Sequence, residues 1–118
     1  MSWLNSTPLA LLERFLDVNA MRQTLVSTNL ANVDTPGYHT RDVDFRGELY
    51  RAMNGDDTSM TSPFVLPVRG LLARPDGNNV SVDRESLLLA EVQLQFKAAT
   101  SVLRAQYASI QTAIREGQ

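Results

Sequence analysis

The chain has 118 residues, of which 43% are hydrophobic and 20% charged, and its net charge is −2. This length allows one small domain, and the composition excludes both a wholly disordered chain and a fibrous repeat. The scattered basic residues form no patch that would indicate a nucleic-acid partner, and the absence of cysteine excludes disulfides and thiol chemistry.

The first predicted element is a helix over residues 8–32. Thr7 can cap this helix and Pro8 suits its first position, whereas Pro36-Gly37 cannot continue it. Apolar residues recur every seven positions, and further apolar residues lie off that stripe: Leu4, Leu11, Val18 and Leu25 in the stripe, and Leu9, Leu12, Leu16 and Val26 outside it. A helix that is apolar on several sides needs more than one packing partner.

The second predicted zone, residues 33–82, has little periodicity and is expected to be irregular. Residues 54–62 are mostly polar, contain Gly55 and are followed by Pro63, which predicts an exposed linker. Pro75-Asp76-Gly77 predicts a tight turn, across which residues 70–73 and 79–82 can pair as a short β-hairpin. We expect such a hairpin to rest on a helix, because an isolated one is marginally stable.

The third predicted element is a helix over residues 83–116, in which Asp83 is the expected N-cap. No Pro or Gly interrupts it before Gly117, and its length would be about 50 Å at 1.5 Å per residue. Two seven-residue series predict a packing seam over four heptads, with one polar exception: Leu89, Phe96, Leu103 and Ile110 in one series, and Val92, Ala99, Gln106 and Ala113 in the other.

The positions that flank this seam carry no charge, unlike those of a two-stranded coiled coil in water. They are Gln93, Thr100, Tyr107 and Ile114 on one side and Leu88, Gln95, Val102 and Ser109 on the other. A simple hairpin of the two terminal helices, which is the alternative, would leave much of this surface uncovered, and such patches mark interfaces. We therefore predict a mainly α fold, one domain over residues 1–118, whose long terminal helices form a coiled-coil or helical-bundle assembly core.

Residues with catalytic potential are few. His39 is the only histidine, and a single loop histidine is typical of solvated surface. Asp34, Asp42 and Asp44 lack the regular ligand spacing of a calcium loop, so loop capping and pairing with Arg41 explain them better. No phosphate-binding loop, nucleophile elbow or zinc-protease pattern is present. The sequence thus predicts no enzyme, no metal site, no cofactor and no small-molecule substrate.

Residues 28–38 read Thr-Asn-Leu-Ala-Asn-Val-Asp-Thr-Pro-Gly-Tyr. Asn29 and Asn32, at the end of the first helix, can bond exposed backbone carbonyls or an adjoining helix. Asp34 can cap the turn that follows, and Pro36-Gly37 fixes that turn while the glycine permits a positive φ. The tyrosine that ends the segment supplies an aromatic anchor with a polar tip.

This segment resembles the signature of the bacterial flagellar rod and hook axial proteins, an Asn-hydrophobic-Ala-Asn…Thr-Pro-Gly-Tyr stretch after the N-terminal helix. Residues 41–45 and 76–85 extend the resemblance, which covers about residues 8–53 and 75–117, with departures at His39, Thr40 and Ser81. It makes the following positions candidates for assembly: Asn29, Ala31, Asn32, Asp34, Thr35, Pro36, Gly37, Tyr38, Asp42, Asp44 and Phe45, together with the seam residues Leu89, Val92, Phe96, Ala99, Leu103 and Ile110.

The resemblance implies a structural subunit of the proximal rod that polymerises through its terminal helices, transmits torque and lines the export channel. The implied partners are copies of the same chain, the rod protein FlgC, the rod-base adapter FliE, the membrane-ring protein FliF and the flagellar export apparatus. The implied location is the periplasmic rod of the basal body, and residues 1–5 have no basic segment leading into an apolar one, so we expect export without a cleaved signal peptide.

Two alternatives stay open. FlgC shares the first motif, although it typically ends with an Arg-x-Tyr-x-x-Asn stretch that this chain lacks. A soluble coiled-coil adaptor that binds one helical partner is the alternative from another class, and charged seam flanks would have favoured it.

Overall fold

The computed structural model describes residues 8–55 and 62–117. Within them the chain forms three helices and two short strands, in the order α2 (Pro8–Ala31), β1 (Arg41–Val43), α3 (Phe45–Met53), β2 (Val65–Pro67) and α4 (Val82–Glu116). This confirms the predicted mainly α class with long terminal helices and a small antiparallel sheet in the middle.

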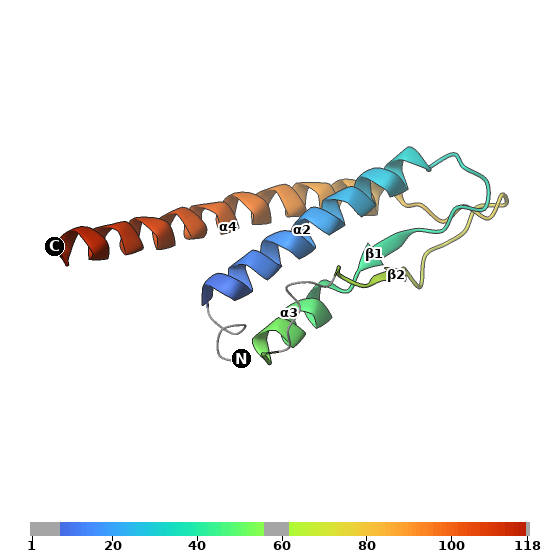
Figure 1. Ribbon diagram of the computed structural model, residues 1–118. Coiled ribbons are helices and arrows are strands. Elements are labelled where there is room, and N and C mark those ends of the chain that lie inside the picture. Colours follow the sequence, from blue (N-terminus) through green and yellow to red (C-terminus); the bar gives the residue numbers. More distant parts are fainter. Residues whose placement is uncertain (1–7, 56–61, 118) are drawn as a thin grey trace.

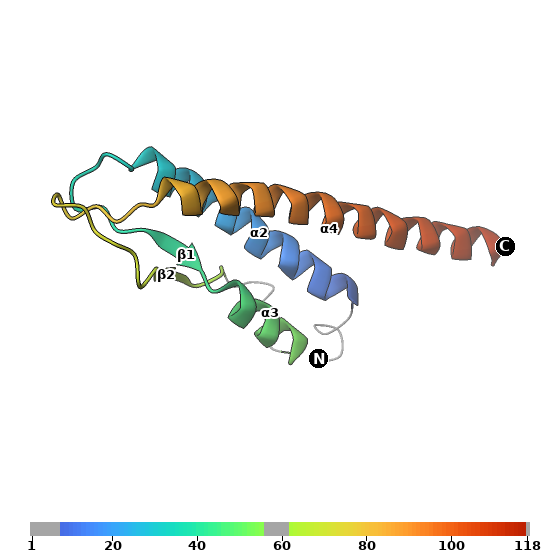
Figure 2. The same ribbon diagram turned by 180° about the vertical axis from the view of Figure 1, so that it is seen from behind.

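The two long helices, α2 and α4, lie side by side and run in opposite directions (Figures 1 and 2). At one end they are joined by the loops that lead into and out of the small sheet, and α3 lies along the N-terminal half of α2. Because α4 has 35 residues and α2 has 24, the C-terminal part of α4 extends past α2. The molecule is therefore elongated, with a longest dimension of 68 Å.

The ends of the long helices follow from local signals. α2 begins at Pro8, as predicted, while its predicted cap Thr7 lies outside the described residues. The predicted N-cap of α4 was wrong by two residues: Ser81 is the cap, and its Oγ accepts the backbone N–H of Arg84 at 3.2 Å. Asp83 lies instead in the first turn, where a carboxylate is favoured by the helix dipole.

The helix α3 was not predicted, since it lies within the zone expected to be irregular. Asp44 caps it, because the carboxylate Oδ1 accepts the backbone N–H of Gly47 at 3.2 Å. A Cβ at Gly47 would approach the Asp44 Oδ2 to 2.1 Å, so a side chain at this position would require the Asp44 carboxylate to shift. Of the predicted linker 54–62, only Asn54, which caps the C-terminus of α3, Gly55 and Ser62 lie among the described residues.

The predicted hairpin was placed wrongly. The observed strands are β1 and β2, which pair antiparallel with Arg41 opposite Pro67 and Val43 opposite Val65. Residues 70–73 and 79–82 form no strand. The predicted turn between them does form, with the Gly77 N–H donating to the Arg74 carbonyl at 2.8 Å.

The backbone after that turn pairs with a different partner, which is the physical reason for the error. The Gly37 N–H donates to the Asp76 carbonyl at 2.8 Å, and the Asn79 N–H donates to the Tyr38 carbonyl at 3.2 Å. Residues 76–79 therefore use their backbone groups to join the loop that follows α2 instead of residues 70–73.

The apolar core lies between α2 and the elements that pack on it. Val18 and Leu25 of α2 cluster with Val43 of β1, and Met21 and Phe45 pack against them. The rings of Phe15 and Phe45 meet edge to face, with centroids 5.2 Å apart. Toward α4, the buried apolar residues are Val26, Val92 and Ala99.

Candidate functional site

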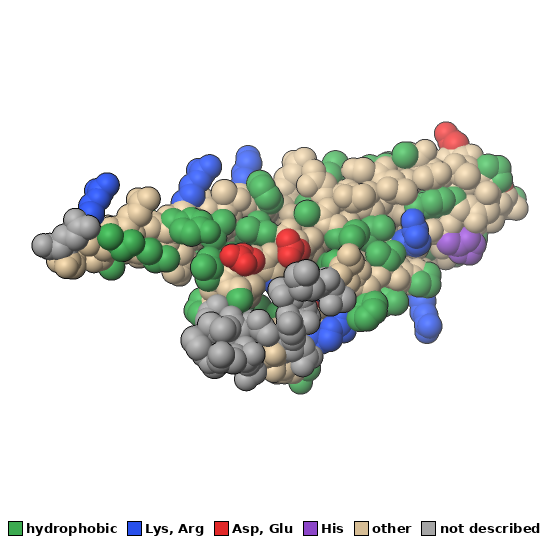
Figure 3. Space-filling view, in the orientation of Figure 1, with side chains coloured by type: hydrophobic (Ala, Val, Ile, Leu, Met, Phe, Trp, Pro, Cys, Tyr) green, Lys and Arg blue, Asp and Glu red, His purple; other side chains and the backbone are tan. Residues whose placement is uncertain are grey.

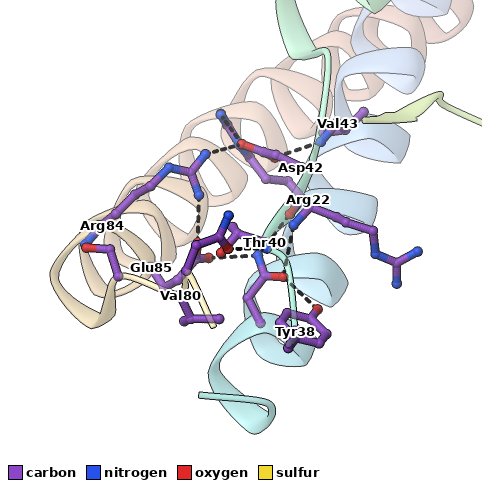
Figure 4. Close-up of polar contacts among 12 residues, drawn as sticks. Arg22, Tyr38, Thr40, Asp42, Val43, Val80, Arg84 and Glu85 are labelled. Carbon is purple, nitrogen blue, oxygen red and sulfur yellow. Dashed lines mark hydrogen bonds and ion pairs between the residues drawn. The ribbon is translucent and has the colours of Figure 1, made fainter. Parts of the chain in front are cut away.

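The two sequence motifs meet at the end of the molecule where α2 ends and α4 begins. We call this meeting point the junction: it comprises Arg22 and Asn29 of α2, residues 32–42, residues 74–80, and Arg84 and Glu85 of α4. Figure 4 shows its polar contacts, which come from both long helices and from both loops. Segments that lie about 50 residues apart in the sequence are thereby held together.

Asn29 is the central residue of the junction and is 1% exposed. Its Nδ2 donates to the Arg41 carbonyl at 2.8 Å and to Glu85 Oε2 at 3.2 Å. Its Oδ1 accepts from the Tyr38 hydroxyl at 2.8 Å and from the Arg41 N–H at 3.2 Å. One side-chain amide thus forms hydrogen bonds with the loop after α2 and with a carboxylate on α4. The prediction that it bonds backbone carbonyls or an adjoining helix is confirmed.

Two carboxylates of the junction are held by arginines, Asp42 by one from each long helix and Glu85 by its neighbour Arg84. Asp42 accepts from Arg22 Nε at 3.2 Å and Arg22 Nη2 at 3.0 Å, and from Arg84 Nη2 at 2.8 Å. The fully buried Glu85 accepts from Arg84 Nη1 at 2.6 Å. The predicted pairing of an aspartate with Arg41 was wrong, because Arg22 and Arg84 occupy Asp42. Carboxylates bound in this way cross-link elements, and removing one partner would leave a charge uncompensated.

Asn78 fastens the second loop to the first. Its Nδ2 donates to the carbonyls of Asn32 and Thr35 at 2.8 and 2.9 Å, and its Oδ1 accepts the Val80 N–H at 2.8 Å. The neighbouring Asn79 accepts the Thr40 N–H on its Oδ1 at 2.7 Å. The two asparagines therefore provide hydrogen bonds that a β-ladder would otherwise supply.

Two glycines allow this close approach of the loops. Gly37 has a φ of 75°, as the sequence predicted, and Gly77 has a φ of 87°. A Cβ at Gly77 would lie 3.3 Å from the Gly37 Cα, which is tighter than ordinary packing. Both the backbone conformation and the available space thus favour glycine at position 77.

Some of the remaining motif residues form hydrogen bonds or packing contacts within the subunit, and others are exposed at its surface. Asn32 Nδ2 donates to the Thr28 carbonyl at 2.8 Å, and Asn32 Oδ1 accepts from the Thr35 hydroxyl at 3.0 Å. Asp34 is exposed, and the side-chain bond within this turn is made by Asn32 instead. The other motif residues lie as follows: Ala31 and Pro36 exposed, Asp44 at the cap of α3, and Phe45 against the core.

A second polar cluster, which the sequence did not predict, joins α2 to α3. Glu48, 1% exposed, accepts from Arg14 Nη2 at 2.7 Å, from the Phe64 N–H at 2.9 Å, and from Arg51. Burial raises the pKa of Glu48, but the Phe64 N–H, the Arg14 hydrogen bond and the charges of both arginines outweigh it. The pKa therefore lies below its ordinary value of 4.5.

The predicted seam of α4 is covered along only part of its length. Val92 and Ala99 are buried against α2, and Leu89 and Leu103 are half-buried. Phe96 is 50% exposed and Ile110 46% exposed, and every residue from Arg104 to Gly117 is exposed. The seam is thus an internal contact near the junction and a bare apolar stripe toward the C-terminus.

An apolar groove of about 300 Å³ lies between α2, α3 and α4. Its apolar lining comes from all three helices: Pro8, Leu11, Leu12, Phe15, Leu49, Met53 and Val102. Figure 3 shows hydrophobic side chains spread along this elongated surface, including the projecting part of α4. Apolar surface of this extent on a small protein is typical of an interface.

Over residues 8–55 and 62–117, no three His, Cys, Asp or Glu side chains gather closely enough to hold a metal ion. His39 is exposed, and Asp34, Asp42 and Asp44 do not converge on one site, since they lie in a surface turn, at the junction and at the cap of α3. In the same part of the chain, no helix is both long and apolar enough to cross a membrane.

No family model matches the sequence. Among characterised relatives, the "Flagellar basal body rod protein FlgB" of Escherichia coli (strain K12) is 34% identical over 86% of this chain and 88% of its own. The proteins of the same name from Salmonella typhimurium and Borrelia hermsii are 32% and 30% identical, over 86% and 89% of this chain and 88% and 93% of theirs.

These relatives, together with the helix pair and the two motifs that meet at the junction, define a rod protein of the bacterial flagellar basal body. The chain belongs to the FlgB family. The relatives carry this name and not that of FlgC, the alternative that the sequence had left open.

Proposed function

We propose that the chain is a structural subunit of the proximal flagellar rod and catalyses no reaction. It polymerises through its terminal helices, which line the export channel, and it transmits torque. The observation that carries this proposal is the bare seam of α4 and its flank: Ile110 continues the seven-residue spacing of Leu103 and Ile114 flanks the seam, yet they are 46% and 59% exposed. Exposed apolar residues at core spacing require cover from outside the chain.

The junction supports a mechanical role. Torque passing from one helix to the other must cross contacts that keep their geometry, and here Asn29, Asp42 and Glu85 are each bound by two or more donors or acceptors. A cluster of charged hydrogen bonds from two helices and two loops resists relative sliding better than apolar contacts alone, because each bond has a preferred direction. The same arrangement supports the single axial domain proposed for residues 1–118, with its long helices at residues 8–31 and 82–116.

The proposed partners are further copies of this chain, FlgC, FliE, FliF and the flagellar export apparatus, and the proposed location is the periplasmic rod. The family supports this proposal, as do the exposed faces of α2 and α4 that several helical neighbours would cover. Within the candidate set, the residues proposed to contact neighbours are five of those that the chain itself leaves exposed: Ala31, Asp34, Pro36, Phe96 and Ile110. Asn29, Asp42 and Val92 act instead by fixing the shape of the subunit.

The test replaces Ile110 and Ile114 together by alanine in the source bacterium lacking its own copy of the gene. Because both side chains project into solvent, we expect unchanged thermal stability of the purified chain and a loss of swimming and of rod incorporation. The matched control is Gln111→Ala, an exposed polar residue on the same helix, which should swim normally. Normal basal bodies in the double variant would contradict the proposal.

The soluble adaptor is the remaining alternative, and one measurement separates the two functions. An adaptor forms a discrete complex with one helical partner, whereas a rod subunit is recovered with purified basal bodies. Detection of the chain in isolated basal bodies by mass spectrometry supports the rod subunit, and its exclusive recovery in a small soluble complex supports the adaptor.

A further inference from the structure

The exposed charges of α2 are all acidic. This helix carries four charged residues, and the two arginines turn into the molecule, Arg14 toward Glu48 and Arg22 toward Asp42. Glu13 and Asp17 are exposed. They are four residues apart and so lie on one line along the helix. We call this line the acidic edge.

Three exposed basic residues of α4 form a line of the opposite sign. Lys97, Arg104 and Arg115 are exposed and follow one another at intervals of seven and eleven residues. These intervals are close to two and three full helical turns, so the three side chains share one side of α4. We call this line the basic edge. Glu91 and Glu116 lie off it, on other sides of the helix.

The two edges lie on opposite sides of a surface that is apolar between them. Figure 3 shows acidic side chains over α2, basic side chains projecting along the far edge of α4, and hydrophobic side chains between them. Phe96, which is 50% exposed, lines a shallow hollow with Lys97 and Arg104 of the basic edge. Within residues 8–55 and 62–117, the structure gives none of the five edge charges an ion-pair partner.

We propose that the acidic edge of one copy packs beside the basic edge of a second copy, so that Glu13 and Asp17 face Lys97 and Arg104. This rests on the proposed function, which it deepens by naming the face through which neighbouring copies meet. Because the edges differ, the contact is heterologous: each added copy leaves one acidic and one basic edge free, and the contact repeats. The complementary charges fix partner choice and register.

The test is a charge swap scored by swimming in the source bacterium lacking its own copy of the gene. Glu13→Lys with Asp17→Lys sets basic against basic, and Lys97→Glu with Arg104→Glu sets acidic against acidic. We expect each double variant to lose swimming and the quadruple variant, in which both edges are reversed, to recover it. The control, Arg46→Glu with Arg69→Glu, makes the same change in net charge as the Lys97/Arg104 variant at exposed positions elsewhere and should swim.

A chemical test is possible because Lys97 is the only lysine of the chain. A carbodiimide couples an amine directly to a carboxylate, so rods assembled from a mixture of unlabelled and ¹⁵N-labelled copies should yield mixed-label peptides joining Lys97 to Glu13 or Asp17. Wild-type rods that link Lys97 only to other carboxylates would overturn the proposal, as would double variants that swim normally. Either of these results would overturn the edge-to-edge contact and leave the proposed rod function standing. A wild-type gene that fails to restore swimming would count against both the contact and the rod function.

Discussion

Replacement of Asn29 by alanine tests whether the junction determines the fold of the subunit. The change removes four hydrogen bonds and leaves the Arg41 N–H and carbonyl, the Tyr38 hydroxyl and one oxygen of the buried Glu85 without this partner. Each lost bond costs about 1 kcal/mol when water can replace it, and about 1–3 kcal/mol when the group stays buried. Because Tyr38 and Arg41 are partly accessible and Glu85 is not, we expect a total loss of about 4–6 kcal/mol.

The assay is urea unfolding followed by circular dichroism, with Asn32→Ala as the matched control. Asn32 is also an asparagine at the end of α2, but its amide donates to the Thr28 carbonyl, which already accepts the Asn32 backbone N–H at 3.1 Å. Its loss should cost less than about 1 kcal/mol, since no buried group is left unpaired. Equal free energies of unfolding for the two variants would refute the idea that Asn29 is the centre of the junction.

Three further predictions follow from the structure. Glu48→Gln should reduce the loss of stability at acid pH. The depressed pKa of Glu48 gives stability that is present above pH 4.5 and is lost as the pH falls below it. In urea titrations from pH 6 to about pH 3, the free energy of unfolding should therefore fall more for wild type than for the variant. Gly77→Ala should lower the free energy of unfolding more than Gly70→Ala, because both glycines have a positive φ but only a Cβ at 77 meets Gly37; equal losses would show that the loop approach is unimportant. In the monomer, amide hydrogens of residues 104–116 should exchange faster than those of residues 85–99, and uniform protection along α4 would contradict the bare seam.

The two long helices could be predicted from the sequence because their limits are set locally. Pro8 and Pro36-Gly37 bound the first, and the absence of Pro and Gly before Gly117 allows the second. The cap of α4 was misplaced because Ser81 and Asp83 are both good capping residues. Which of them is the cap depends on the residue at which the backbone enters the helix. Such an ambiguity of one or two residues is normal at helix ends.

The helix α3 escaped prediction because a charge occupies its inner face. Phe45, Glu48, Leu49 and Ala52 have the spacing of a core-facing helix, yet Glu48 interrupts the apolar pattern and Gly47 weakens helix propensity. Only the structure shows that Arg14 neutralises the buried carboxylate. The signal that could have found α3 is the N-cap aspartate at position 44 followed by this spacing.

The polar contacts of the junction could be predicted only in part. The position of Asn29 at the end of a helix indicated that its amide would bond nearby carbonyls, but its link to Glu85 spans 56 residues and leaves no periodic trace. The hairpin failed for the same reason, because residues 76–79 have a turn signal but their pairing partners at residues 37–38 lie beyond the reach of any local rule. Long-range polar pairing requires three-dimensional information.

The unequal lengths of α2 and α4 have a consequence for how such chains can vary. The apolar pattern of α4 repeats every seven residues, so apolar packing alone would allow α4 to shift along α2 by about 10 Å, the length of one repeat. The bonds from Arg84 and Glu85 to Asp42 and Asn29 select one alignment, and they do so at the opposite end from the C-terminus. Heptads can therefore be added to or removed from α4 beyond Gln106 without shifting how the two helices match. The distance that the free end reaches is an adjustable dimension of the subunit, independent of the rest of its fold.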